Sequence, residues 1–109
     1  MARPAAKEDV FRAIADPTRR RLLDLLREGE KPVGTMADRF ELTLAAISQH
    51  LRVLREVGLV TERRDGRQRL YSIEPGPLRE VVDWIAEYER FWTHKMDALD
   101  TYLKKRNEK

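Results

Sequence analysis

An arginine-rich stretch past the middle of the chain has the chemistry to bind a polyanion. Its arginines surround the Asp65-Gly66 pair, a strong signal for a tight hairpin turn whose tip projects from the domain. Guanidinium groups at such a tip can reach phosphates or enter a narrow minor groove of DNA. A second basic run, residues 19–21, is interpreted as solvated helix surface. The candidate contacts of the hairpin turn are Arg64, Arg67, Gln68 and Arg69.

A second set of candidates lies on one predicted helix, residues 43–56. Gln49 carries an amide that can pair bidentately with adenine in the major groove, and Ser48 could bond a base or a phosphate. Ala45 and Ala46 are small enough to approach a thymine methyl, although alanine is also simply a good helix former. His50 is interpreted as structural or close to DNA. The whole candidate set on this helix is Thr43, Ala45, Ala46, Ser48, Gln49, His50 and Arg52.

The flanking residues predict the helix that would present this set. Thr43 is of the type that caps helix N-termini, and apolar residues recur from there up to Gly58 at helical spacing. These apolar side chains are predicted to face inward, which leaves the polar residues on the outside; these are Ser48, Gln49, Arg52 and Arg55. The predicted inward set is Leu44, Ile47, Leu51 and Leu54.

Three helices are predicted ahead of this one. Apolar residues recur at helical spacing over residues 10–14, and Asp16 then caps a second helix that begins at Pro17. The second helix has leucines on one broad face and ends at Gly29. After a break at residues 30–32, a short helix is predicted. Its inward residues are Val33, Met36, Ala37 and Phe40.

A β-hairpin and a long helix complete the predicted order. Short strand-like runs at residues 59–62 and 69–73 flank the turn, and Pro75-Gly76-Pro77 closes the hairpin. A last helix is predicted from about Leu78 to Lys105. This order, α-α-α-α-β-β-α, is that of a winged helix-turn-helix. We therefore predict a mainly α fold with a small β-hairpin, in which residues 1–109 form a single DNA-binding domain.

The last helix carries more apolar surface than one small domain can bury. Its apolar residues alternate at spacings of three and four, as in helices that pair with a partner. We predict a homodimer held by the first and last helices, which suits the high charged fraction of 38%. The alternative is that this stripe belongs to the core of one chain. The predicted interface residues are Phe11, Leu78, Ile85, Tyr88, Trp92 and Leu99.

Composition argues against several classes of function. The chain has no cysteine, which excludes disulfides, thiolate metal sites and cysteine nucleophiles. Its five glycines are scattered at caps and turns, and acids and histidines do not converge in a catalytic pattern. We therefore predict neither an enzyme nor a cofactor. No stretch approaches the roughly 20 apolar residues of a membrane span, so a cytoplasmic protein without a membrane partner is expected.

Several linked motifs together closely resemble the ArsR-type (ArsR/SmtB) family of small bacterial repressors. They are residues 14–23 (IADPTRRRLL), residues 46–54 (AISQHLRVL), Gly58-Leu59-Val60, and the stretch from Gly66 to Tyr71. The similarity extends from about residue 10 to residue 73. It implies a dimeric winged-helix repressor that binds double-stranded DNA at an imperfect palindrome and often controls its own operon.

The sequence departs from this family at the places where many members bind metal. The best-known site uses cysteines in the short helix before the recognition helix, and residues 33–38 offer none. A second family site uses acids and histidines of the last helix, where this chain has other residues at the matching places. His94 with Asp97 and a nearby acid, Asp83 or Glu87, could form a different zinc site, although such pairs are common on helix surfaces. The chain resembles the family branch without metal sites, whose members sense an organic effector or none.

Two alternatives to plain repression remain open at the level of the sequence. One is a metal- or small-ligand-responsive derepressor of the same fold. The other is a winged helix that binds proteins through the same helix and wing. The arginines of residues 63–69 argue against a protein partner, because a protein interface favours apolar anchors over a turn with this much positive charge.

Overall fold

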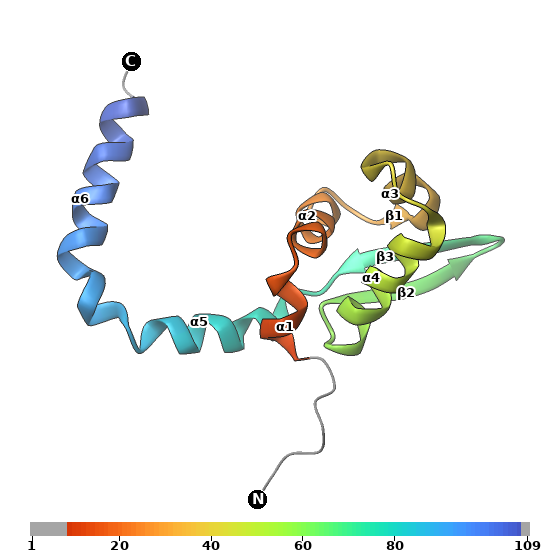
Figure 1. Ribbon diagram of the computed structural model, residues 1–109, viewed down its shortest axis with the longest axis horizontal. Coiled ribbons are helices and arrows are strands. Elements are labelled where there is room, and N and C mark those ends of the chain that lie inside the picture. The colour runs from red at the N-terminus through yellow and green to blue at the C-terminus, as the bar shows by residue number, and fades with distance from the viewer. Residues whose placement is uncertain (1–8, 108–109) are drawn as a thin grey trace, which may run out of the picture. The chain divides into compact units, whose positions relative to one another are not determined.

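The computed structural model describes the backbone of residues 9–107 and the side chains of residues 9–92 and 100–105. The chain divides into two compact units, the first ending at Arg79 and the second beginning at Glu80. The first unit holds four α-helices, a small sheet and a short 3₁₀ helix (Figure 1). The prediction that the chain is a single domain stays a prediction.

Helices α1 (Val10–Ala15) and α2 (Pro17–Leu26) meet at Asp16, as the sequence predicts. The Arg19 backbone N–H donates to Asp16 Oδ2 at 3.0 Å, and Pro17 occupies the first helical position, where it loses no hydrogen bond. The Arg19 N–H bond is also the main reason why the pKa of Asp16 lies below its ordinary value. This cap sets the direction in which α2 leaves α1.

The interpretation of residues 19–21 as solvated surface holds for Arg20 and Arg21, which are exposed, and is wrong for Arg19, which is half-buried. Arg19 donates from Nε to the carbonyl of Ala13 at 2.7 Å, and Arg20 donates from Nη1 to the carbonyl of Ile14 at 2.7 Å. The last carbonyls of a helix have no partner within the helix, and cations are favoured there. The side chains of Arg19 and Arg20 therefore close the C-terminus of α1.

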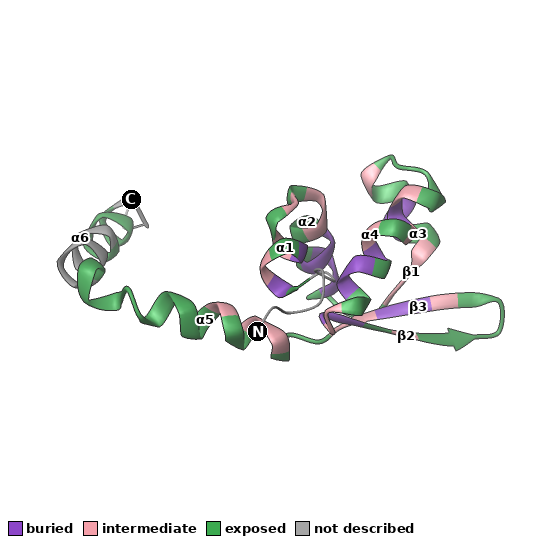
Figure 2. Cartoon of the chain, turned by 60° about the horizontal axis from the view of Figure 1, so that its bottom comes forward, coloured by how far each residue is buried: buried purple, intermediate pink, exposed green. Residues whose placement is uncertain are grey.

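Helices α3 (Val33–Phe40) and α4 (Leu44–Glu56) form the predicted helix-turn-helix pair. The turn between them contains Glu41 in the left-handed region, with φ of 55°, and Thr43 caps α4 by accepting from the Ala46 N–H at 3.0 Å. Ile47, Leu51 and Leu54 of α4 are buried, as predicted. Buried side chains also line the inner faces of α2 and the sheet (Figure 2).

Leu44 does not belong to this buried set, so its predicted inward position is wrong. Its side chain is 57% exposed, whereas Leu51 is fully buried. Leu44 occupies the first position of α4, where the apolar stripe has run past the core that covers Ile47 and Leu51. Helical spacing alone does not show where the core ends.

The sheet has one strand more than the predicted hairpin. Strand β1 (Lys31–Pro32) pairs with β3 (Gln68–Ile73), which pairs in turn with β2 (Val60–Asp65), giving the antiparallel order β1-β3-β2. A proline does not predict a strand, but it is tolerated at a sheet edge because no partner there requires its missing N–H. The hairpin turns at Gly66, with φ of 63°, and its tip extends beyond the helices of this unit (Figures 1 and 2).

The predicted continuous helix from Leu78 to Lys105 is interrupted. A short 3₁₀ helix (Gly76–Leu78) is followed by α5 (Arg79–Ala86) and α6 (Glu89–Asn107). At the break, the N–H groups of Glu87 and Tyr88 bond the carbonyls three residues before them rather than four. Such tight turns end α-helical pairing. The local sequence has no glycine or proline to predict this break.

Aromatic rings gather at the break between α5 and α6. The Tyr88 ring lies edge-on to Trp84 at 5.5 Å between centroids and stacks with Trp92 at 6.5 Å. Both geometries are favourable for aromatic pairs. Ile85, Tyr88 and Trp92 nevertheless remain exposed within this unit. Across the described residues, no helix is long and apolar enough to cross a membrane.

Candidate nucleic-acid interface

A shallow hollow of about 230 Å³ lies over the exposed face of α4 beside β3. Its lining combines the two candidate sets, because residues of the polar helix face and one arginine of the hairpin contribute to it. The other two lining residues are Arg55 and Tyr71. The predicted DNA contacts that line this hollow are Ala45, Ser48, Gln49, Arg52 and Arg69.

Gln49 is the polar group of this hollow best placed to bond an outside ligand. Its side chain is exposed and makes no hydrogen bond with the residues that the structure describes. Arg52 is exposed as well, with Nε 3.8 Å from Glu56 Oε2 in a loose pair one helical turn away. Exposed pairs of this kind hold each other weakly. Both side chains can therefore turn to an incoming base edge or phosphate.

Ser48 and Arg69 bond each other. Arg69 Nη2 donates to Ser48 Oγ at 3.1 Å, and Arg69 Nη1 lies 3.6 Å from Glu62 Oε2. Glu62 Oε1 accepts from Arg55 Nη1. These four side chains, called here the Ser48–Arg69–Glu62–Arg55 chain, begin and end on α4 and pass through both strands of the hairpin. They fix the helix against the base of the wing.

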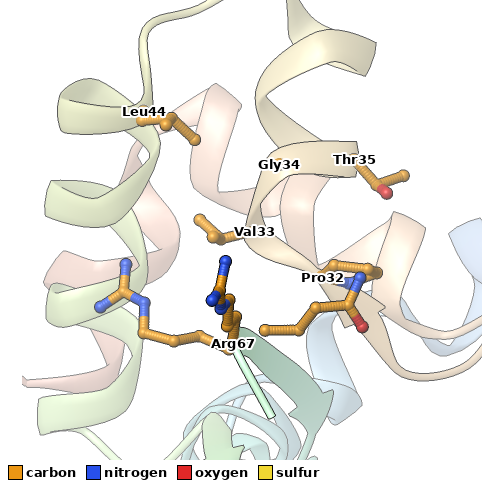
Figure 3. A pocket seen from close by; sticks show the side chains of 8 residues that line it. Pro32, Val33, Gly34, Thr35, Leu44 and Arg67 are labelled. Carbon is orange, nitrogen blue, oxygen red and sulfur yellow. The ribbon is translucent and has the colours of Figure 1, made fainter. Parts of the chain in front are cut away.

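A groove of about 340 Å³ adjoins the hollow on the side of α3. Leu44 at the start of α4 and Val33 at the start of α3 point toward one another there, above Arg67 of the hairpin (Figure 3). Gln68 and Arg69 complete the wing side of the groove. Arg69 lines both the hollow and the groove, so the two form one surface.

The arginines near the hairpin tip divide into free and paired groups. Arg64 and Arg67 are exposed and make no ion pair or hydrogen bond with the described residues. Arg63 donates from Nε and Nη2 to the two Glu30 oxygens, each at 2.8 Å. The Arg63 hydrogen bonds are the main cause of a lowered Glu30 pKa, and the same pairing raises the pKa of Arg63. Two cations at the tip thus remain available to an anion.

Strand register explains this division. Arg64 pairs with Arg69 and Glu62 with Tyr71 across the β2–β3 ladder, so these four side chains share the face on which Arg69 meets α4. Arg63 lies one residue away on β2 and therefore points to the opposite face. There it reaches past β3 to the residue before β1, where Ser72 also donates to Glu30 Oε2 at 3.2 Å.

Of the predicted contacts on α4 and its cap, Thr43, Ala46 and His50 do not line the hollow. Thr43 Oγ1 accepts from the Ala46 N–H and so caps the N-terminus of α4. His50 is half-buried and lies toward α2, where Arg19 Nη1 stands 3.4 Å from its Nδ1. A guanidinium can only donate, so this contact requires Nδ1 to be the acceptor. The geometry agrees with the structural interpretation of His50.

Comparison with known proteins agrees with this geometry. A helix-turn-helix domain family matches residues 14–63. The transcriptional repressor SdpR of Bacillus subtilis (strain 168) is 35% identical over 80 residues, which cover 73% of this chain and 89% of SdpR. The crystal structure of the ArsR family transcriptional regulator RHA00566 is 35% identical, covering 76% of this chain and 86% of that one, with a TM-score of 0.68. The chain belongs to the ArsR family of transcriptional regulators.

The winged helix-turn-helix fold of this ArsR-type regulator is thereby confirmed. It is also similar to the homodimeric winged helix-turn-helix DNA-binding domain of a possible ArsR-family regulator from Mycobacterium bovis. That domain is 33% identical, covering 72% of this chain and 76% of the domain, with a TM-score of 0.61. The family consists of transcriptional regulators and not of enzymes.

Among the residues that the structure describes, no three side chains of histidine, aspartate or glutamate gather closely enough to hold a metal ion. The side chains of His94 and Asp97, the pair considered for zinc, lie outside the described residues, as does that of Leu99.

Three residues of this surface are absent from the predicted contacts: Arg55, Glu62 and Tyr71. Arg55 is predicted on the outward face of the helix, and it lies seven residues after Ser48 on the same side of α4. Tyr71 is buried beneath the arginines, and this burial raises the pKa of its hydroxyl. The role of Glu62 depends on how strands β2 and β3 align, which residue spacing alone does not give.

Proposed function

We propose that this ArsR-type regulator is a repressor that binds an imperfect palindrome as a homodimer and controls its own operon. The observation that carries the proposal is the hollow of α4 and β3, which exposes Gln49 and Arg52 beside Arg69. A helix of about 10–12 Å diameter fits the major groove, which is about 12 Å wide. A regulator of this kind works beside the chromosome, in the cytoplasm.

In this arrangement α4 enters the major groove with its N-terminal half. Gln49 pairs with an adenine edge, a contact worth about 1–3 kcal/mol of discrimination. Ala45 contacts a thymine methyl or allows the close approach of the helix, and Arg52 bonds a guanine or a phosphate. Because Ser48 is held by Arg69, it contributes mainly by fixing the helix.

The wing supplies affinity without sequence preference. Arg64 and Arg67 extend beside Gly66, and neither is paired with a carboxylate of the described residues. Each phosphate that they neutralise releases counterions, so their contribution falls as salt rises. Gln68 adds a polar contact to the backbone.

Dimer formation is proposed through the first and last helices. Ile85, Tyr88 and Trp92 form an exposed apolar face on α5 and α6, and Phe11 and Leu78 are half-buried. The homodimeric domain from M. bovis supports the same assembly. Two-fold symmetry would then place two half-sites about one helical turn of DNA apart.

The test begins with a duplex selected from a randomised pool by the wild-type protein. Gln49→Ala is expected to reduce the preference for the selected duplex over a scrambled one by about 5- to 100-fold, as expected for losing about 1–3 kcal/mol of base discrimination. Arg67→Ala is expected to weaken binding to both duplexes alike. It is also expected to reduce the slope of log affinity against log salt concentration by about one. Arg27→Ala, at the residue after the end of α2, removes the same charge far along the chain from the surface and serves as control.

Gel-shift titrations over a range of salt concentrations measure these quantities. If the wild-type protein selects no duplex at moderate salt, sequence-specific repression is refuted. If Gln49→Ala keeps the full preference, the proposed docking of α4 is wrong. Repeating the titration with zinc and with a chelator tests whether the protein is a metal sensor. Release of the DNA by zinc would identify a metal-responsive regulator.

A further inference from the structure

We propose that Glu62 is a specificity-determining residue that acts by holding two arginines away from DNA phosphates. This inference rests on the proposed DNA binding by α4 and the wing. Glu62 is the acid in the middle of the Ser48–Arg69–Glu62–Arg55 chain, on the surface that would face DNA. A carboxylate there repels phosphates, so its presence calls for a physical reason.

The contacts of Glu62 supply that reason. Its two oxygens face different elements, because Oε1 accepts from Arg55 of α4 and Oε2 lies 3.6 Å from Arg69 of β3. Its side chain is only 17% exposed, while those of Arg55 and Arg69 are 50% and 35% exposed. Poor solvent access limits screening of the carboxylate and makes its pairs stronger than fully exposed ones. The acid is thus enclosed by two cations that reach the surface.

The local fold brings these groups together from three elements. Ser48 and Arg55 lie two turns apart on one side of α4, and Glu62 and Arg69 are diagonal neighbours across the β2–β3 ladder. Arg69 also donates to Ser48, so its planar group has two fixed partners. A guanidinium held in this way keeps one position and one direction.

Restraint of the arginines favours specific over non-specific binding. Non-specific affinity comes from cations that can move to any phosphate. The slope of log affinity against log salt concentration steepens by about 0.9 for each phosphate that is neutralised. Because Arg55 and Arg69 are paired with Glu62, they do not neutralise phosphates in non-specific binding. The same pairs align the wing with α4, as simultaneous contact with the major groove and the backbone requires.

The replacement Glu62→Gln tests this inference because it keeps the shape of the side chain and removes the charge that holds both arginines. Affinity for a scrambled duplex is expected to rise about 3- to 10-fold, and its salt slope to steepen by about one to two. Preference for the selected duplex is expected to fall by at least about 5-fold. Glu74→Gln, which removes an equal charge from an exposed acid without an arginine partner in the described residues, is expected to change the slope little.

A double variant separates released arginines from the simple loss of a negative charge. The double variant carries both Glu62→Gln and Arg55→Gln. Its gain in log affinity for the scrambled duplex over wild type is expected to be at most half of the gain in Glu62→Gln alone. Thermal unfolding of each variant checks that the domain is folded. An unchanged slope in Glu62→Gln, or equal effects in Glu62→Gln and Glu74→Gln, would overturn the inference. The scrambled-duplex arm needs no operator, so its result stands even if sequence-specific repression is refuted.

Discussion

Leu44 and Leu51 are the same residue type on one helix, yet the structure gives them different roles. Leu51 is fully buried beneath α4, whereas Leu44 lies exposed at the first turn, in the groove that also holds Arg67. Burial determines how much a side chain stabilises the fold, because only area removed from water contributes. The two leucines should therefore differ in their effect on stability.

Truncating each leucine to alanine measures that difference. Leu51→Ala is expected to lower the free energy of unfolding by about 2–5 kcal/mol, since it leaves a cavity in the core. Leu44→Ala is expected to lower it by less than about 1 kcal/mol. Urea denaturation with a common m-value gives both numbers. Equal losses for the two variants would show that Leu44 is buried in solution.

Residue types predicted much of the candidate surface, because the chemistry of a side chain is visible in a sequence. The types and spacing of Gln49, Arg52 and Arg69 predict DNA contacts, and the structure brings these residues into one hollow. Pairing between side chains was not predictable in the same way. Whether Arg63 binds Glu30 or remains free depends on the order of three strands, which contacts distant in sequence decide.

At the scale of elements, the capped helices were the most predictable parts. Asp16-Pro17 and Thr43 fix the starts of α2 and α4 through local hydrogen bonds, which operate within four residues. Strand β1 and the break between α5 and α6 were missed for the opposite reason. Lys31 and Pro32 become a strand only by pairing with β3. The break between α5 and α6 has no glycine or proline that would predict it.

The cap of α2 leads to a prediction about pH. Asp16 has a lowered pKa in the folded protein, first because it accepts from the Arg19 N–H, so its charge stabilises the fold above the ordinary value of 3.8. That stabilisation is lost as the pH falls through the lowered folded value. Asp16→Ala is expected to cost about 1 kcal/mol at pH 7 through loss of the cap.

The variant Asp16→Asn would still cap the helix but without a charge, because an asparagine side chain also accepts a hydrogen bond at this position. Its stability deficit relative to wild type is therefore expected to shrink as the pH is lowered below about 4. Chemical denaturation at pH 7, 5 and 3 follows this deficit. A deficit that stays constant over this range would mean that the Asp16 charge does not stabilise the fold.

At the scale of the whole molecule, the second unit presents several exposed apolar side chains. Ile85, Tyr88 and Trp92 are exposed on α5 and α6, in an amount unusual for a surface without a partner. Aromatic side chains of this kind are common anchors of protein interfaces. A second copy of the chain is the occupant expected from the proposed function.

A charge placed on this face is expected to separate the dimer. Ile85→Lys is expected to weaken dimerisation by more than about 30-fold, as for the loss of roughly 2 kcal/mol at an interface centre. Glu80→Lys, on another side of the same helix, is expected to leave the dimer intact. Light scattering at micromolar concentration distinguishes the masses. A wild-type protein that is monomeric under these conditions would refute the predicted interface.

Strand β1 has a consequence for the order in which this protein can fold. Its pairing with β3 joins Lys31 to Tyr71, about 40 residues later in the chain, and so closes a loop that contains α3, α4 and β2. Closing a loop of that length costs chain entropy on the order of 3 kcal/mol before any contact compensates for it. Every side chain proposed to meet DNA, from Ala45 to Gln68, lies inside that loop. The DNA-binding surface and the sheet are therefore expected to form in one cooperative step, so a fragment that lacks either β1 or β3 would lose both.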